Sequence, residues 1–147
     1  MVKRIIIAVI VVGIVVGVVV FFKIEKCDSK SVGDVVYEVV EEEDIPREIM
    51  DEINGYKSKM DEGGDYGKGM RRASFLCSDE MYIVVFYGEQ DTDGYSIEVS
   101  ELYESKNAIF VETVLMGPKS VKEIKEVKSY PYIVIKIPVS EKQVVFI

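Results

Sequence analysis

The hydrophobic and polar positions divide the chain into an apolar leader and a longer, mixed part. Residues 5–22 are 18 consecutive residues without a polar side chain, rich in Ile and Val. A helix of this length spans about 27 Å at about 1.5 Å per residue, close to the hydrocarbon thickness of a bilayer, roughly 30 Å. The pattern therefore predicts an amino-terminal membrane anchor, residues 1–22, with a single-pass transmembrane helix over residues 5–22.

A cleaved signal peptide is the alternative interpretation of this leader. Cleavage requires small residues after the apolar run, whereas Lys23, Ile24, Glu25 and Lys26 follow it here. We therefore expect an uncleaved signal anchor, followed by a polar tether over residues 23–33. Basic residues flank both ends of the anchor, so counting them leaves the orientation open. A very short leader before one long domain is typical of anchors that export the carboxyl-terminal part, and we expect residues 34–147 to be extracytoplasmic.

Two glycines in the predicted membrane helix are four residues apart. This spacing of Gly13 and Gly17 would let two helix backbones approach closely, which makes them candidates for a homodimer contact. Glycine is also common in membrane helices that do not dimerise. Dimerisation through this face is therefore a hypothesis.

Beyond the tether, the pattern changes to short alternating segments and one helical segment. Residues 34–40 alternate in a way that predicts a first strand. Over residues 45–60 the apolar side chains recur at intervals of three and four, which predicts a helix. We expect Asp44 to cap this helix, Pro46 to lie in its first turn and Gly55 to stop or weaken it.

The second half of the chain is predicted to be almost entirely β-structure. Four glycines within residues 61–69 indicate a mobile loop, and residues 119–128 permit a short helix, a charged strand or a loop. The predicted strands are residues 72–77, 81–87, 95–103, 108–116, 131–138 and 143–147. The expected fold class is therefore mainly β with one short helix (α+β), a small antiparallel, sandwich-like domain behind a transmembrane helix.

Composition excludes several classes of function. The chain has 26 acidic and 18 basic residues, a net charge of -8 and no histidine. An acidic surface repels nucleic-acid phosphates, and the lack of histidine removes Ser/His/Asp triads, Cys/His dyads and imidazole metal ligands. Two cysteines cannot form a four-thiolate site, and there is no Walker-type phosphate loop. We expect no cofactor, no metal, no nucleic-acid partner and no enzymatic activity.

Two acidic segments could be mistaken for ion sites. Residues 89–94 begin like a calcium loop, but the twelfth position is Ser100 instead of the closing Glu, and strands flank it. Residues 41–44 are four successive carboxylates, whose side chains diverge. We interpret the first as an acidic hairpin loop and the second as a solvated run before a helix.

The carboxyl-terminal half contains an ordered series of turn and aromatic residues between apolar strands. After the strand over residues 81–87 come Gly88, Thr92-Asp93-Gly94-Tyr95, Pro118, Tyr130-Pro131-Tyr132 and Val144-Val145-Phe146. This order resembles the PrcB C-terminal domain family, named for a surface subunit of a spirochaete protease complex. The resemblance covers about residues 77–147. Asp93 replaces the first glycine of the Thr-Gly-Gly-Tyr step, although Asp is also a turn former.

The resemblance implies a small β-rich domain displayed on the cell envelope as a non-catalytic partner in a protease assembly. The residues that carry the motif, and that are candidates for the interface, are Gly88, Thr92, Gly94, Tyr95, Pro131 and Tyr132. From its place between two strands we expect Gly94 to adopt a positive φ and Tyr95 to be a core aromatic. Loops on a rigid sheet often carry recognition, so we expect the contact surface on residues 88–95 or 61–69.

The two cysteines could form a disulfide if the domain is exported. Pairing of Cys27 with Cys77 would pin the tether against the sheet. The alternative is two unrelated thiols, with Cys77 simply a small core residue.

These observations predict a membrane-anchored, non-catalytic protein-interaction domain on the outer side of the cell membrane, acting as an accessory subunit of an envelope protease complex. A self-associating structural envelope protein is the main alternative. A Ser/Lys hydrolase using Ser74, Ser78 or Ser96 is disfavoured, because it needs a buried lysine with a lowered pKa beside the serine.

Overall fold

The computed structural model describes residues 30–61, 69–120 and 124–147. The predicted transmembrane helix over residues 5–22 lies outside these ranges, as do Gly13, Gly17 and Cys27. Within the described ranges, none of the helices combines the length and apolarity needed to cross a bilayer. The membrane anchor therefore stays a prediction.

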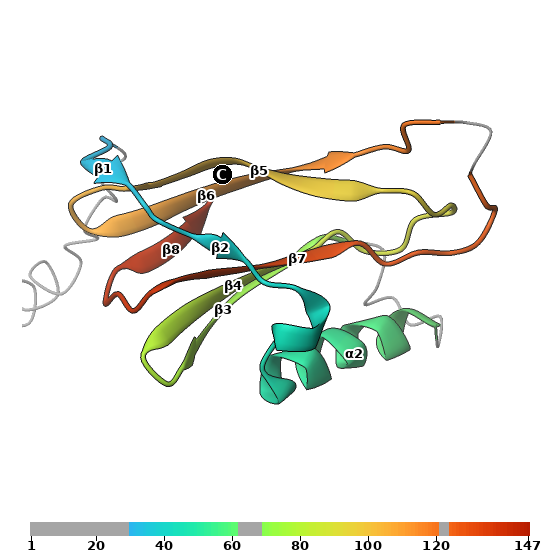
Figure 1. The fold of residues 1–147 in the computed structure, drawn as a ribbon, viewed down its shortest axis with the longest axis horizontal. Helices are drawn as coiled ribbons and strands as arrows, with labels where there is room; N and C mark the ends of the chain where they lie inside the picture. Colours follow the sequence, from blue (N-terminus) through green and yellow to red (C-terminus); the bar gives the residue numbers. More distant parts are fainter. Residues whose placement is uncertain (1–29, 62–68, 121–123) are drawn as a thin grey trace, which may run out of the picture.

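The described chain forms two four-stranded sheets and one α-helix, arranged in three layers (Figure 1). The first sheet has the strand order β1-β5-β6-β8 and the second β2-β7-β4-β3. The elements are β1 (Gly33–Asp34), β2 (Glu38–Val39), the 3₁₀ turn η1 (Glu42–Asp44), α2 (Arg47–Asp61), β3 (Arg71–Cys77), β4 (Glu80–Phe86), β5 (Ser96–Glu104), β6 (Ala108–Met116), β7 (Tyr132–Pro138) and β8 (Gln143–Phe146). The predicted mainly-β domain with one helix is confirmed.

The second sheet is the middle layer and is buried on both faces. On β4, Ile83 and Val85 belong to the core between the two sheets, whereas Val84 and Phe86 belong to the core beneath α2. Strand β7 divides its side chains in the same way. This double burial explains why both strands are rich in apolar residues; the exception inside β7 is Lys136, which pairs with Glu38 and Glu80.

Helix α2 confirms the predicted helix but not its details. Its buried face carries Ile49, Ile53 and Met60, which pack on the second sheet. The Pro46 carbonyl oxygen accepts hydrogen bonds from the N–H groups of Ile49 and Met50, both at 3.0 Å, so Pro46 precedes the first helical residue. Asp44 ends η1 instead of capping α2. The helix continues past Gly55, because the packing of its apolar face outweighs the cost of one interior glycine, about 1 kcal/mol.

The single strand predicted over residues 34–40 is wrong. Its two ends lie in different sheets: β1 pairs with β5 at Tyr103 and Glu104, and β2 pairs with β7 at Ile135 and Lys136. The chain therefore crosses from one sheet to the other between them (Figure 1). Val35 packs against the core between the sheets and Val40 against the core beneath α2, while Val36 and Tyr37 between them are exposed.

The remaining strands match their predicted ranges closely, and one pairing differs from expectation. The described pairs are antiparallel except that of β6 with β8, which is parallel. Residues 124–128, the described end of the ambiguous segment, form neither helix nor strand. Residues 62–68 of the predicted mobile loop lie outside the described ranges.

Candidate functional site

The loop after β4 and the segment before β7 lie side by side at one end of the molecule (right-hand side of Figure 1). Gln90 and Ser129 exchange both backbone hydrogen bonds, with N···O distances of 2.8 and 3.0 Å. The Ser129 hydroxyl donates to the Thr92 carbonyl oxygen at 2.6 Å. The Tyr87 N–H donates to the Pro131 carbonyl oxygen at 2.9 Å. Motif residues that are far apart in the sequence therefore belong to one hydrogen-bonded unit.

Two motif glycines provide the turns that this unit requires. Gly88 has φ +81° and Gly94 has φ +85°, a region that residues with a Cβ rarely adopt. The positive φ predicted for Gly94 is confirmed. A Cβ at Gly94 would also lie 3.2 Å from the Cβ of Pro118, so this glycine allows the two loops to approach. Tyr95 is half-buried, directly before β5.

Asp93, the departure from the family pattern, has a specific role in this structure. One of its carboxylate oxygens, Oδ1, accepts a hydrogen bond from the Lys125 N–H at 2.8 Å. The Asp93 N–H in turn donates to the Lys125 carbonyl oxygen at 3.2 Å. A glycine at position 93 could make only the second bond, so the substitution adds a link between the loops.

The acidic loop directs its first carboxylate at the neighbouring segment. Glu89, with only 15% of its side chain exposed, lies 3.0 Å from the Lys128 ammonium. The Tyr130 hydroxyl donates to its other oxygen at 3.4 Å. Among the residues that the structure describes, no three Cys, Asp or Glu side chains are grouped as a metal site would require. This carboxylate therefore serves to hold the loops together.

Tyr132 joins the second sheet to α2. Its ring stacks on Phe86 with 6.4 Å between centroids, and the Lys57 ammonium lies 4.6 Å from its centroid. Burial, followed by the neighbouring Glu42 carboxylate, raises the pKa of its phenol above the ordinary value. The side chain is therefore a neutral, half-buried packing residue at neutral pH.

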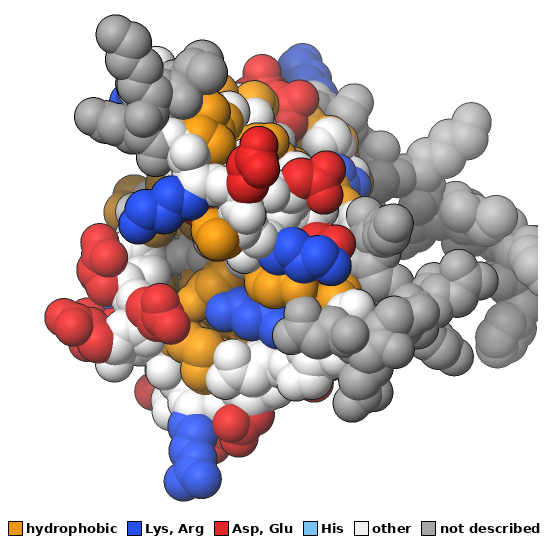
Figure 2. All heavy atoms as spheres, turned by 90° about the vertical axis from the view of Figure 1, so that its right-hand side faces the viewer, with side chains coloured by type: hydrophobic (Ala, Val, Ile, Leu, Met, Phe, Trp, Pro, Cys, Tyr) orange, Lys and Arg blue, Asp and Glu red, His pale blue; other side chains and the backbone are white. Residues whose placement is uncertain are grey.

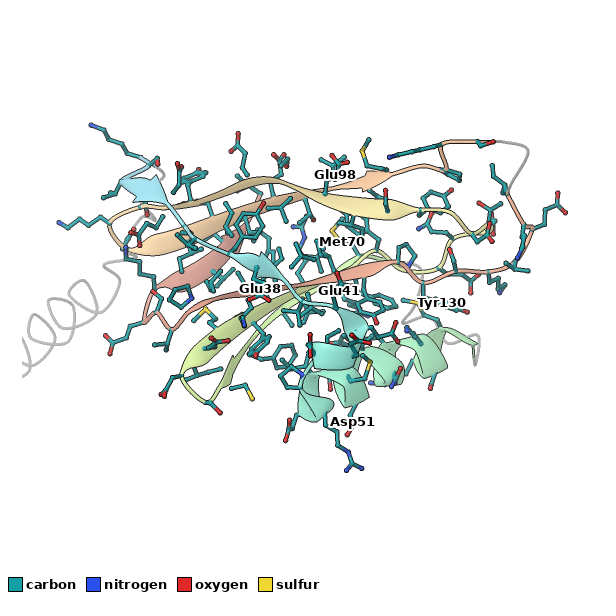
Figure 3. All side chains as sticks on the ribbon, viewed as in Figure 1. Glu38, Glu41, Asp51, Met70, Glu98 and Tyr130 are labelled. Atoms are coloured by element: carbon teal, nitrogen blue, oxygen red, sulfur yellow. The ribbon has the colours of Figure 1, made fainter. Side chains whose placement is uncertain are left out.

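A groove of about 360 Å³ opens beside the end of β2 and the start of β7, and Ile97 of β5 in the first sheet completes its lining. It is lined by Val39, Val40, Glu41, Glu42, Ile45, Ile97, Tyr130, Pro131, Tyr132, Ile133 and Val134. Figure 3 shows Glu38 and Glu41 on the side of the second sheet, Glu98 on the first sheet and Tyr130 toward the loop end. The lining residues are mostly apolar, include the carboxylates of Glu41 and Glu42, and contain no lysine or arginine. Such a surface can accept an apolar segment that also bears positive charge.

A second hollow, of about 330 Å³, lies at the loop end itself. It is lined by Asp93, Gly94, Ser96, Pro118, Lys119, Ser120 and Ile124. Figure 2 shows this end of the molecule, where apolar side chains in the centre are surrounded by charges of both signs. The surface lacks the single-sign charge of the groove, so it indicates no particular class of ligand.

The other predicted site residues are dispersed. Cys77 is half-buried at the end of β3, and its proposed partner Cys27 lies outside the described residues. Ser74, Ser78 and Ser96 are all exposed. Among the described residues, Ser105 is the only buried polar one, so no described lysine has the burial that a catalytic base would require.

Sequence reasoning missed the groove. Its lining comes from residues 39–45 that follow the crossing, from Ile97 of β5 and from residues 130–134, and their meeting depends on the sheet change near residue 36. The one local signal was the carboxylate run over residues 41–44, whose first two members line the groove. By itself this run predicts only solvated carboxylates before a helix.

Comparison with known proteins gives one match. Residues 81–138 match the family described as PrcB C-terminal. No curated protein and no solved structure matches the chain. The matched range runs from β4 to the end of β7 and includes both positive-φ glycines and the paired loops. The predicted resemblance to the PrcB C-terminal family is thus confirmed over residues 81–138.

Proposed function

We propose that this protein is a membrane-anchored, non-catalytic interaction subunit, with residues 34–147 on the outer side of the cell membrane. In this role it binds another envelope protein, as an accessory subunit of a protease complex. The match of residues 81–138 to the PrcB C-terminal family carries the proposal. The apolar run over residues 5–22 supports the anchor.

The geometry supports binding rather than catalysis. The loops at one end are fixed by reciprocal hydrogen bonds, which lowers the entropy lost when a partner binds. Beside them lies an open groove lined mostly by apolar residues. The described residues bury no ionisable side chain, whereas general acid–base and nucleophilic chemistry depends on groups whose pKa is shifted by burial or by charged neighbours.

Site-specific photo-crosslinking in native cells tests the proposed function. A photoreactive residue at Val39, which lines the groove and is 47% exposed, should join the full-length protein to a different envelope protein. The matched control is the same residue at Leu76, which is 65% exposed on β3 and lies outside the groove. We expect the Val39 adduct, identified by mass spectrometry, to be absent from the Leu76 sample. Adducts only between copies of this chain would instead favour the structural, self-associating protein.

Protease treatment of intact cells tests the orientation. An exported domain should be degraded before lysis, while a cytoplasmic control protein survives. Survival of residues 34–147 until lysis would contradict the proposed topology.

A further inference from the structure

One edge of the first sheet is left open by the protein's own amino-terminal strand. β1 covers the end of β5 at Tyr103 and Glu104, and the Val35 N–H donates to the Leu102 carbonyl oxygen at 3.4 Å. The chain then leaves for the other sheet. Within the described ranges, no strand and no backbone hydrogen bond follows on this side of residues 96–101. This stretch, roughly 20 Å long, therefore presents N–H and C=O groups at a free edge, alternately over residues 96–99 and with a shifted register between Val99 and Glu101, where β5 bulges.

The groove continues this open edge inward. Ile97 and Val99, on the inner face of β5, pack against the core between the sheets, and Ile97 lines the groove with Val40 and Ile133. A strand added beside β5 would place every second side chain over these apolar residues. Those inward side chains must be apolar to be buried without cost.

The outward face of the same edge is acidic. Glu98 and Glu101 are exposed on β5 and form no ion pair with a described residue. Glu41 and Glu42, both exposed, line the groove on the inward side of this edge and do not belong to its outward face. The outward side chains of an added strand would therefore meet negative charge, which favours lysine or arginine and disfavours a second acidic strand.

We propose that residues 96–101 of β5, together with the groove, bind an extended segment of a partner protein in which apolar and basic side chains alternate. The segment adds to the first sheet as an antiparallel strand beside β5, in the position that β1 would occupy if it continued past Val35. Main-chain hydrogen bonds to β5 provide affinity for the segment, and the alternation of apolar and basic side chains provides specificity. This inference rests on the proposed binding function and names the chemistry of the partner segment.

Fluorescence anisotropy with the full-length protein in detergent tests this inference. The probe is a fluorescein-labelled Lys-Val-Lys-Val-Lys-Val amide, and the charge control is the Glu-Val repeat of equal length. Two further probes carry N-methyl groups on either the three valine or the three lysine amides. Strand addition predicts that one methylated probe binds about tenfold more weakly or not at all, while the other binds normally, because only alternate N–H groups face β5. The Glu-Val probe should bind at least about tenfold more weakly than the Lys-Val probe.

A matched pair of charge reversals locates the site. Glu98→Lys should weaken binding of the Lys-Val probe at least about threefold, whereas Glu141→Lys, the same change at an exposed position near β8, should leave it unchanged. Far-UV circular dichroism confirms that both variants fold.

Equal effects of the two reversals, equal binding of the two methylated probes, or equal binding of the Glu-Val and Lys-Val probes would each overturn the inference. If no probe binds while Val39 still crosslinks to a different envelope protein, the inference fails and the proposed function stands. If the probes bind as described but no such protein is crosslinked, the proposed function fails and the edge remains a strand-binding site.

Discussion

Replacing two glycines by alanine should change stability in opposite directions. Gly94 has φ +85°, and its added Cβ would lie 3.2 Å from Pro118 Cβ. A side chain in this backbone region costs about 1–3 kcal/mol when the surroundings hold it there. Gly55 lies inside α2, and a Cβ there would meet no atom within 4 Å. Gly55→Ala should therefore gain about 0.5–1 kcal/mol from helix propensity.

The pair is informative because both changes restrict the unfolded chain in the same way. Any difference between them reports on the folded state, and the two estimates together predict a gap of about 1.5–4 kcal/mol. Urea unfolding of the full-length protein in detergent, followed by far-UV circular dichroism, measures it as a shift in midpoint at constant slope.

The result that would refute this reasoning is a Gly94→Ala variant as stable as Gly55→Ala. It would mean that the loop at residue 94 relaxes to a negative φ at no cost. The hydrogen bonds between the loops would then not fix the turn, and the motif glycine would need another explanation.

Three further changes test other parts of the structure. Phe86→Ala, at the completely buried end of β4, should lower the free energy of unfolding by about 3–5 kcal/mol. Its control, Leu76→Ala on the exposed face of β3, should change the free energy of unfolding by no more than about 0.5 kcal/mol. Similar losses of stability in the two variants would contradict the assigned core. Asp93→Gly should cost about 0.5–1.5 kcal/mol by removing the hydrogen bond from Lys125, and an unchanged urea midpoint would show that this bond contributes nothing. The pKa of Tyr132 is raised in the folded state, so folding favours its neutral form. The resulting contribution to the free energy of unfolding is complete below about pH 10 and is lost as the pH rises through the folded-state pKa. Tyr132→Phe should therefore make the loss of stability above pH 10 less steep, and an unchanged slope in urea titrations at several pH values would count against this assignment.

The sequence predicted those parts of the fold whose signal is local. The apolar runs of β4 and β7 and the spacing of Ile49, Ile53 and Met60 each report the surface against which one element packs. The positive φ at Gly94 followed from its place between two strands.

Features that depend on distant partners could not be predicted in this way. The sheet change near residue 36 depends on where the edges of β5 and β7 lie in the fold, and the parallel pairing of β8 depends on where the chain returns after β7. The groove follows from the sheet change, so it was missed with it. Asp93 was predicted only as a turn former, because its partner Lys125 lies in a segment whose structure was left open.

The double burial of β4 has a consequence for how this domain can diverge. Ile83, Val84, Val85 and Phe86 each contact one of two cores, so a polar replacement at any of them would be selected against. On β5 the exposed residues are Ser96, Glu98, Ser100 and Glu101, so substitutions at these positions are tolerated and the outer face is where related proteins can differ in ligand specificity. In a saturation-mutagenesis library, tolerance should therefore alternate over residues 96–99 of β5, be high at both Ser100 and Glu101, and stay uniformly low over residues 83–86 of β4.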